Sequence, residues 1–205
     1  MNYEKIAFTN AVKKLQEIHG SRVAYARKEV VSEEDGLTDA EINFISSRDT
    51  CYLASTSESG YPYIQHRGGP QGFINVVDER TLGMVDFSGN RQYITVGNAM
   101  TNNKVAIILM DYPRKARLKL FAELKIVGID EDPELFRQLA PANYKYHAER
   151  ILLFTVMGYN WNCPQHITPR YTLDEISSAF EERNKYVSEL EEEVKRLRGD
   201  LDTGV

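Results

Sequence analysis

The stretch Tyr61-Pro-Tyr-Ile-Gln-His-Arg-Gly-Gly-Pro-Gln-Gly-Phe73 combines a strand with a corner that carries almost no side chains. Strand alternation would place every second residue, Gln65 among them, on one face. The glycines that follow allow positive φ angles and let a ligand approach the backbone closely. Gln65, His66 and Arg67 stand just before this corner, and all three can hydrogen-bond an anion or a heterocycle. We therefore interpret the stretch as one wall of a small-molecule site.

Further segments are rich in β-forming residues and are separated by short turn sequences. They cover residues 50–56, 73–77, 81–87, 104–110, 116–129 and 149–157. Closely spaced strands of this kind indicate an antiparallel meander, and a meander of about six strands more often closes into a barrel than stays open. The expected fold class is therefore mainly β with flanking helices (α+β), built on an antiparallel six-stranded β-barrel.

Other segments have the period of a helix. Residues 8–19 carry apolar side chains spaced by three and four, and Gly20 would end that helix. Thr38-Asp-Ala-Glu41 is a capping box, which predicts a helix of about two turns. A further short helix is expected at residues 133–139.

The C-terminal residues repeat an apolar side chain at alternating spacings of three and four, which is typical of a coiled coil. The repeat consists of Leu173, Ile176, Phe180, Val187, Leu190, Val194 and Leu197. Arg183 interrupts this seam, and charged residues fill the positions between. The pattern predicts either an amphipathic helix that packs on its own domain or a coiled-coil helix that pairs between protomers.

Length and composition indicate an ordinary globular protein. The 205 residues are 42% hydrophobic and 27% charged, enough for one domain with a buried core. A net charge of −5 argues against general affinity for nucleic acid or anionic membrane. Neither Cys51 nor Cys163 belongs to a CxxC pair, and no apolar run is long enough to span a bilayer. We expect a cytoplasmic protein with a helical extension at 1–37, a main domain at 38–171 and a long helix at 172–205.

Polar side chains gather again where a later strand would end. Ser88-Gly-Asn-Arg-Gln92 precedes a short helix expected at residues 93–100, which Ser88 or Asn90 would cap. Arginine together with helix-end amides suits a phosphate monoester, and amide side chains suit the mixed donor and acceptor edge of a heterocycle. The pattern favours a ligand site without naming the ligand.

The loop Trp161-Asn-Cys-Pro-Gln-His166 is open to several interpretations. A zinc site needs three or four ligands, and no second cysteine or histidine pair lies at ligand spacing, so we expect no metal. Cys163 and His166 would also suit a nucleophilic pair, although no orienting acid is evident. Trp161 would otherwise fill a gap in the core or form an aromatic wall for a flat ligand.

Taken in order, these motifs resemble those of the pyridoxamine 5'-phosphate oxidase-like flavin-binding proteins. The resemblance covers residues 38–171. It rests on the opening stretch together with Asp86-Phe-Ser-Gly-Asn90, Gly97-Asn98, Asp111-Tyr-Pro113, Arg117-Leu118 and the loop that starts at Trp161. It implies a split β-barrel of the FMN-binding type, a homodimer, and FMN bound in a groove between the protomers.

The resemblance also implies which residues hold the cofactor. The flavin ring and ribityl chain would lie along Gln65, His66 and Arg67, and the isoalloxazine would run past Asp86, Phe87 and Ser88. The phosphate would be bound by Asn90, Arg91 and Gln92, with a further contact from Asn98. The partner subunit would contribute Trp161, Asn162, Gln165 and His166.

The function that follows is an FMN-dependent oxidoreductase, which transfers hydride or electrons between the flavin and a small substrate or NAD(P)H. The lysine-containing strand and the Arg-x-His signature of the oxidase itself are not matched, so the vitamin B6 substrate site does not carry over and no catalytic residue is assigned. Two alternatives stay open. One is a flavin carrier or sensor without turnover, whose coiled-coil tail is an interaction surface. The other is a barrel that holds deazaflavin or haem.

Overall fold

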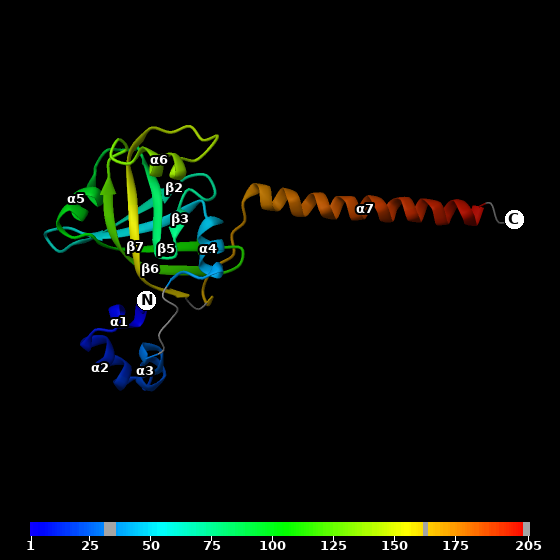
Figure 1. Cartoon of the computed structure of the whole chain (residues 1–205). Coiled ribbons are helices and arrows are strands. Elements are labelled where there is room, and N and C mark those ends of the chain that lie inside the picture. Colours follow the sequence, from blue (N-terminus) through cyan, green and yellow to red (C-terminus); the bar gives the residue numbers. More distant parts are fainter. Residues whose placement is uncertain (31–35, 162–163, 203–205) are drawn as a thin grey trace. The chain divides into compact units, whose positions relative to one another are not determined.

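The computed structural model describes residues 1–30, 36–161 and 164–202 (Figure 1). Within these ranges the chain forms two compact units. The first comprises residues 1–111 and 115–165 and contains every strand. The second comprises residues 112–114 and the chain from His166 onward, and its main element is one long helix.

The first unit is organised around a seven-stranded sheet in which every pair of neighbours is antiparallel. In chain order the strands are β1 (Thr50–Thr56), β2 (Pro62–Gly68), β3 (Asn75–Asp78), β4 (Thr81–Phe87), β5 (Lys104–Asp111), β6 (Ala116–Val127) and β7 (Ala148–Trp161). The order in the sheet is β2-β1-β5-β6-β7-β4-β3. The expected antiparallel β architecture is confirmed.

The expected count of six strands is wrong by one, because every β-rich segment, including the four-residue β3, forms a strand of its own. Among the described residues, the sheet does not close through backbone pairing, and β2 and β3 are its two edges. The backbone hydrogen bonds of these strands therefore do not form the expected closed barrel.

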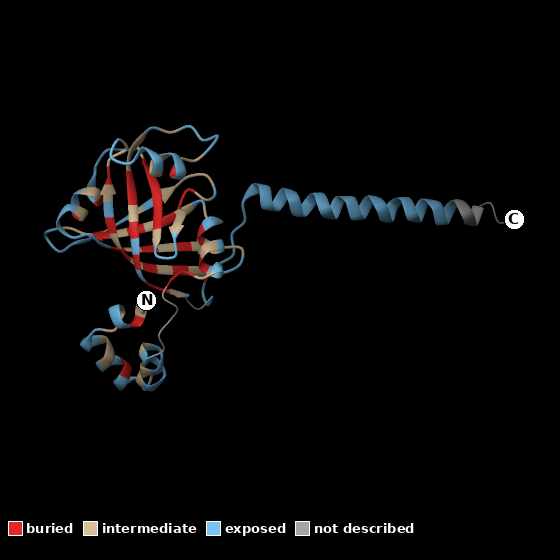
Figure 2. Cartoon of the chain, in the orientation of Figure 1, coloured by how far each residue is buried: buried red, intermediate tan, exposed pale blue. Residues whose placement is uncertain are grey.

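The core lies along the inner face of the sheet, and alternate residues of β1, β5 and β6 are buried there. In β6, Leu118, Leu120 and Leu124 are buried while their neighbours in the chain are more accessible, which is the expected strand alternation. Figure 2 shows the buried residues concentrated on the strands. Each such leucine contributes about 1.5–3 kcal/mol by leaving water, so the alternating pattern is a large part of what fixes the register.

Helices flank the sheet, and the best predicted of them are those with local capping signals. Helix α4 (Asp39–Ser46) begins with the expected capping box. The Glu41 side chain accepts a hydrogen bond from the Thr38 backbone N–H, and the Thr38 side chain accepts one from a backbone N–H of the first turn. Helix α6 (Pro133–Leu139) also occupies its expected residues, and Asp132 accepts a hydrogen bond from the backbone N–H of Leu135 at 2.9 Å.

The N-terminal extension holds three short helices where one was expected: α1 (Tyr3–Ala7), α2 (Asn10–Ile18) and α3 (Arg22–Val30). The predicted helix corresponds to α2. The Tyr3 ring stacks on that of Phe121 in β6, with 4.6 Å between ring centroids. This contact needs a glycine at 158, because a Cβ there would lie 2.8 Å from the backbone nitrogen of Tyr3.

The second unit contains α7 (Leu173–Asp202), which confirms the expected C-terminal helix. A capping box opens it: the Thr172 backbone N–H donates to Glu175 Oε2 at 2.8 Å, and the Glu175 backbone N–H donates back to Thr172 Oγ1 at 3.2 Å. Pairing of this helix with another chain stays a prediction. None of the described helices is both long enough and apolar enough to cross a membrane.

Candidate functional site

Two adjoining hollows lie along β2 on the first unit. The first, about 180 Å³, is lined by Tyr63, Gln65, Arg67, Asp86, Phe87, Gly89, Asn90, Arg91, Gln92, Tyr93, Ile94, Thr95, Val96 and Glu149. The second, about 290 Å³, is lined by Gln65, His66, Arg67, Gly68, Phe73, Met84, Val85, Phe87, Ser88, Gly89 and Tyr144. They share Gln65, Arg67, Phe87 and Gly89, and we refer to the pair as the β2 groove. Each alone is below the range of ~300–1,000 Å³ usual for small-molecule pockets, so a ligand of that size would have to occupy both.

The strand β2 supplies the wall of this groove as its sequence predicts. Gln65 and Arg67 lie two residues apart and so project to the same face. His66 points to the other face, where its ring packs edge-on against Tyr52 with centroids 5.6 Å apart, yet it also lines the second hollow. Gln65 Oε1 accepts a hydrogen bond from the Thr95 hydroxyl at 3.0 Å, which ties β2 to the next helix.

The glycine corner after β2 serves the fold directly. A Cβ at Gly69 would lie 2.7 Å from the Cβ of Phe73, and Gly72 has φ of +79°. Phe73 is buried, so the bare backbone at Gly69 lets its ring pack inward beneath the groove. The corner therefore turns the chain tightly around Phe73.

A network of ion pairs includes three of the residues that line the groove, Arg67, Asp86 and Glu149. Arg67 on β2 pairs with Asp86 on β4, and Arg150 on β7 approaches the same carboxylate with Nε 3.3 Å from Asp86 Oδ2. Arg150 also pairs with Glu149 beside it. Asp86 is buried, so two guanidinium groups offset the cost of taking its charge out of water.

Two donors in this network, Arg67 Nε and Arg150 Nε, are buried and make no hydrogen bond to the described residues. Arg67 Nη1, by contrast, donates to Asp86. A buried N–H without an acceptor costs about 1–3 kcal/mol, which makes such groups rare in folded proteins. Because Arg67 lines both hollows, a ligand in the β2 groove with an acceptor atom would meet this need.

Helix α5 (Ile94–Thr101) begins at the other end of the groove. The expected caps, Ser88 and Asn90, are wrong: the cap residue is Tyr93, with φ of +55°, and it makes no side-chain hydrogen bond to the helix. Asn90 instead accepts from the backbone N–H of Gln92 at 3.2 Å. Arg91 and Tyr93 have left-handed backbone conformations, and the Asn90 side chain bonds within this turn rather than to the helix.

This start of α5 exposes directed donors to the groove. The first residues of the helix, Ile94, Thr95 and Val96, line the first hollow, and N–H groups in a first turn have no intrahelical partner. Beside them lies Arg91, whose side chain is 71% exposed and whose Nε is 3.9 Å from Glu149 Oε1. Uncapped helical N–H groups beside an exposed guanidinium group suit an anionic oxygen group such as a phosphate.

The neighbours of Glu149 stabilise its ionised form. A hydrogen bond from Ser88, then contacts from Arg150 and the charge of Arg91, lower the pKa of the Glu149 carboxyl below its ordinary value, against the opposing effect of burial. The carboxylate is therefore ionised at neutral pH and forms ion pairs with both arginines.

The structure brings together nine of the residues predicted from sequence around the β2 groove: Gln65, His66, Arg67, Asp86, Phe87, Ser88, Asn90, Arg91 and Gln92. Asn98 is elsewhere. Its side-chain amide is buried and donates to Ser55 Oγ at 2.9 Å, so it anchors α5 to β1.

The described residues Trp161, Gln165 and His166 do not line either hollow. Trp161 ends strand β7, where a loop had been expected from residue 158, and its Nε1 donates to Glu41 while its ring packs edge-on against Phe44. Asn162 and Cys163 lie outside the described residues. Gln165 and His166 are exposed. An approach of this segment from a partner subunit stays a prediction.

Sequence reasoning missed several residues that line the groove, Tyr63, Tyr93, Tyr144 and Glu149, and it missed Arg150, which pairs with Asp86. The Asp86 and Arg150 positions are cross-strand partners in the β4–β7 ladder, and nothing local in the sequence reveals that register. Among the described residues, no three His, Cys, Asp or Glu side chains are grouped as metal ligands would be.

A family comparison fits this geometry. The family model described as pyridoxamine 5'-phosphate oxidase matches residues 37–158, more than half of the chain. The chain belongs to this family. The match contains every strand of the sheet except the last three residues of β7, and it contains both hollows of the β2 groove. No curated protein matches the sequence.

Solved structures of related folds also match. HupZ from Group A Streptococcus gives a TM-score of 0.50 at 14% identity, over 66% of this chain and 100% of its own. A protein of the pyridoxinephosphate oxidase family from Clostridium acetobutylicum gives 0.45 at 18% identity, over 67% and 94%. An FMN-binding protein from Syntrophomonas wolfei gives 0.44 at 13% identity, over 73% and 97%. At these identities the HupZ match supports the shared fold alone.

Proposed function

We propose that the protein is an FMN-binding oxidoreductase and that the β2 groove holds the flavin. The observation that carries this proposal is the meeting of three donor groups in one groove: the orphaned Nε of Arg67, the Arg91 guanidinium, and the uncapped start of α5. A phosphate-bearing, acceptor-rich heterocycle satisfies all three, and membership of the oxidase family favours FMN among such ligands.

Each part of the groove has a distinct role in this proposal. Arg91 and the first turn of α5 bind the phosphate, assisted by Asn90 and Gln92. Gln65 and Arg67 face the ring system, where an amide and a guanidinium match its acceptor and donor edges. Asp86 does not touch the cofactor through its carboxylate, because Arg67 and Arg150 already engage it; it fixes the Arg67 side chain instead.

When bound, FMN would supply hydride and electron transfer with a small substrate or NAD(P)H. The chain's own contribution is electrostatic. The positive charge of Arg67, held by the buried Asp86, lies where it would favour a negatively charged reduced ring over a neutral one. Removal of that charge would lower the reduction potential of the bound flavin.

We also infer that the working form is a cytoplasmic homodimer built on a split barrel, with the Trp161 to His166 segment reaching the partner's groove. One feature supports this: Trp161, Gln165 and His166 line neither hollow of their own chain, and Trp161 instead donates to Glu41. FMN affinity should fall in the Arg67→Ala variant and in the Gln165→Ala or His166→Ala variant. A mixed dimer of an Arg67→Ala chain and a His166→Ala chain should keep one of its two sites intact if the site is shared, and neither if each chain forms its own site.

Turnover is tested by anaerobic reduction of the FMN-loaded protein with NADH, NADPH and a panel of small reductants. Bleaching of the flavin by one of them, followed by reoxidation with an acceptor, is expected for an oxidoreductase. A flavin that binds tightly but is reduced by none of them would favour the second candidate, a flavin carrier or sensor without turnover. Deazaflavin or haem would be recognised from the mass of the ligand released on denaturation.

A further inference from the structure

Helix α7 exposes an apolar stripe along its whole described length. Every residue from Leu173 to Arg198 is exposed, and Figure 2 shows the helix in the colour of exposed residues. Its large apolar side chains include Leu173 at 81% and Phe180 at 52% exposure. Helices in water draw most of their stability from packing an amphipathic face, and exposed apolar stripes mark interaction surfaces.

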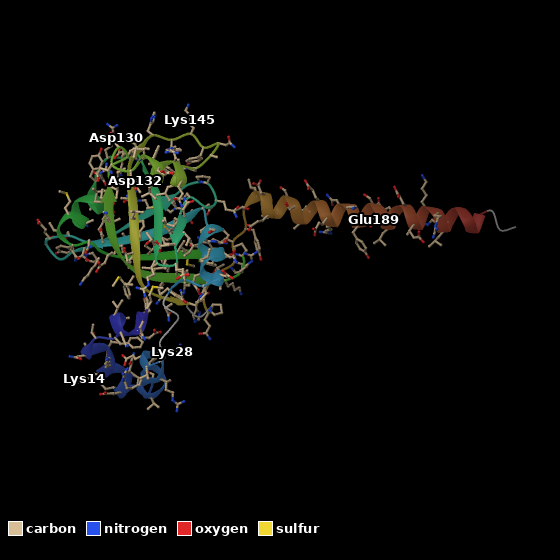
Figure 3. The ribbon with its side chains drawn as sticks, viewed as in Figure 1. Lys14, Lys28, Asp130, Asp132, Lys145 and Glu189 are labelled. Atoms are coloured by element: carbon tan, nitrogen blue, oxygen red, sulfur yellow. The ribbon has the colours of Figure 1, made fainter. Side chains whose placement is uncertain are left out.

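The stripe keeps a heptad register without a break in phase. With the a positions at Leu173, Phe180, Val187 and Val194, the d positions fall at Ile176, Arg183, Leu190 and Leu197. Figure 3 shows side chains along the length of the helix and labels Glu189, which the heptad count puts at a c position, outside this seam. In the second half, Val at a and Leu at d is the combination that favours two parallel strands.

We propose that α7 pairs with α7 of a second copy of this chain as a parallel, in-register, two-stranded coiled coil. The proposal goes beyond flavin binding and does not depend on it. A second copy is the occupant because the seam is self-complementary: each a or d layer would meet the same residue of the other chain.

The charges beside the seam favour the parallel direction. Glu193 is at a g position and Arg198 at the following e position, and in a parallel pair g of one helix faces that e of the other. Two such ion pairs would form, one on each side. In the antiparallel arrangement that aligns the same seam, Glu193 would face Ala179 and gain nothing. Within its own helix Glu193 already contacts Arg196 at 2.6 Å, so the Arg198 contact would extend an existing pair.

Arg183 sets the register. In the in-register pair the two Arg183 side chains share one d layer, where their stems pack and their guanidinium groups turn outward to water. A shift by one heptad would bury each Arg183 against an apolar layer of the other chain and so break two layers. The charged layer thus costs stability and disfavours shifted alignments.

Cysteine cross-linking of the full chain tests the proposal. In a Cys163→Ser background, Leu190→Cys places one thiol in the seam, and Ser188→Cys places one at a b position as the matched control. Cys51 does not interfere, because burial raises the pKa of its thiol to about 12. Under mild oxidation we expect most of the Leu190→Cys protein to become a covalent dimer and the Ser188→Cys protein to stay single-chain.

Two results would overturn the proposal. Equal cross-linking of both variants would mean that the tails are merely brought near each other, without a specific seam. Cross-linking of Phe180→Cys to Leu190→Cys in a mixture, with little Leu190→Cys homodimer, would mean that the helices run antiparallel. Flavin absorbance recorded on the same samples separates either result from a failure of the proposed cofactor site.

Discussion

Arg67 Nη1 donates to Asp86 Oδ1, and this ion pair joins the edge strand β2 to β4, near the opposite edge of the sheet. No backbone ladder among the described residues links these two strands. The sheet therefore curves enough to bring β2 close to β4, and an ion pair rather than backbone hydrogen bonds connects these two strands. The β2 groove lies at this junction, so the residues that close the fold are also those that face the proposed ligand.

The first prediction concerns this ion pair. Arg67→Met removes one of two cations from the buried Asp86 and should destabilise the protein by about 1–3 kcal/mol, less than complete loss of pairing because Arg150 remains. Urea unfolding gives the value. Exposed Arg91→Met is the matched control and should change stability little. Equal stability of Arg67→Met and wild type would contradict the structural role.

The second prediction separates the phosphate contact from the ring contacts. Arg91→Ala should weaken FMN binding by about 1–3 kcal/mol, the loss expected for one charge-assisted hydrogen bond. Binding of riboflavin, which lacks the phosphate, should be unaffected. Fluorescence titrations of the flavin-free protein measure both ligands. If Arg91→Ala bound FMN as tightly as wild type does, Arg91 would have no phosphate role.

The third prediction is a pH dependence at Glu149. The pKa of Glu149 is lower in the folded protein than in the unfolded chain, chiefly because of its hydrogen bond with Ser88. Its ionised form therefore adds stability above the ordinary pKa near 4.5, and that contribution is lost as pH falls through the lower folded-state pKa. The stability gap between wild type and Glu149→Gln should be full at pH 7 and shrink in acid, as measured by urea unfolding at each pH. Glu58→Gln, in an exposed turn, is the control, and a gap that grows in acid would refute the assignment.

The fourth prediction concerns Cys51. Burial raises the pKa of this thiol to about 12, so almost no thiolate exists at neutral pH. In the Cys163→Ser variant, a thiol-reactive dye should label the native protein hardly at all and the urea-unfolded protein fully. Rapid labelling of the native state at neutral pH would show that β1 opens or that the thiol is accessible.

The fifth prediction concerns the charged layer of the tail. Arg183→Leu would complete the apolar seam and should stabilise helix pairing by up to about 1.5–3 kcal/mol per chain, the value of burying one leucine. Thermal unfolding followed by circular dichroism should show a higher midpoint for the helical signal. Arg183→Lys keeps the charge and should leave the midpoint near that of wild type. A lower midpoint for Arg183→Leu would argue against a seam through position 183.

Features that depend on neighbours in the chain were predictable. The Thr38–Glu41 capping box, the alternation in β6 and the helical period of α7 each follow from residues a few positions apart. The wall at Gln65 and Arg67 follows from strand periodicity in the same way.

Features that depend on tertiary contacts were not predictable. Arg150 meets Asp86 only through the register of β4 with β7, and α1 is held by the stacking of Tyr3 on Phe121. The cap of α5 was misassigned because the chain turns through left-handed residues at Arg91 and Tyr93, which no capping rule anticipates. Trp161 was expected in a loop, but its pairing opposite Leu118 extends the strand.

The central claim is that the β2 groove binds FMN, and the most direct measurement is the mass and absorption spectrum of the ligand released from the purified protein. The proposal predicts a yellow protein that releases FMN, or a flavin-free protein that binds added FMN with loss of affinity in Arg91→Ala. A colourless protein that does not bind added FMN would contradict it.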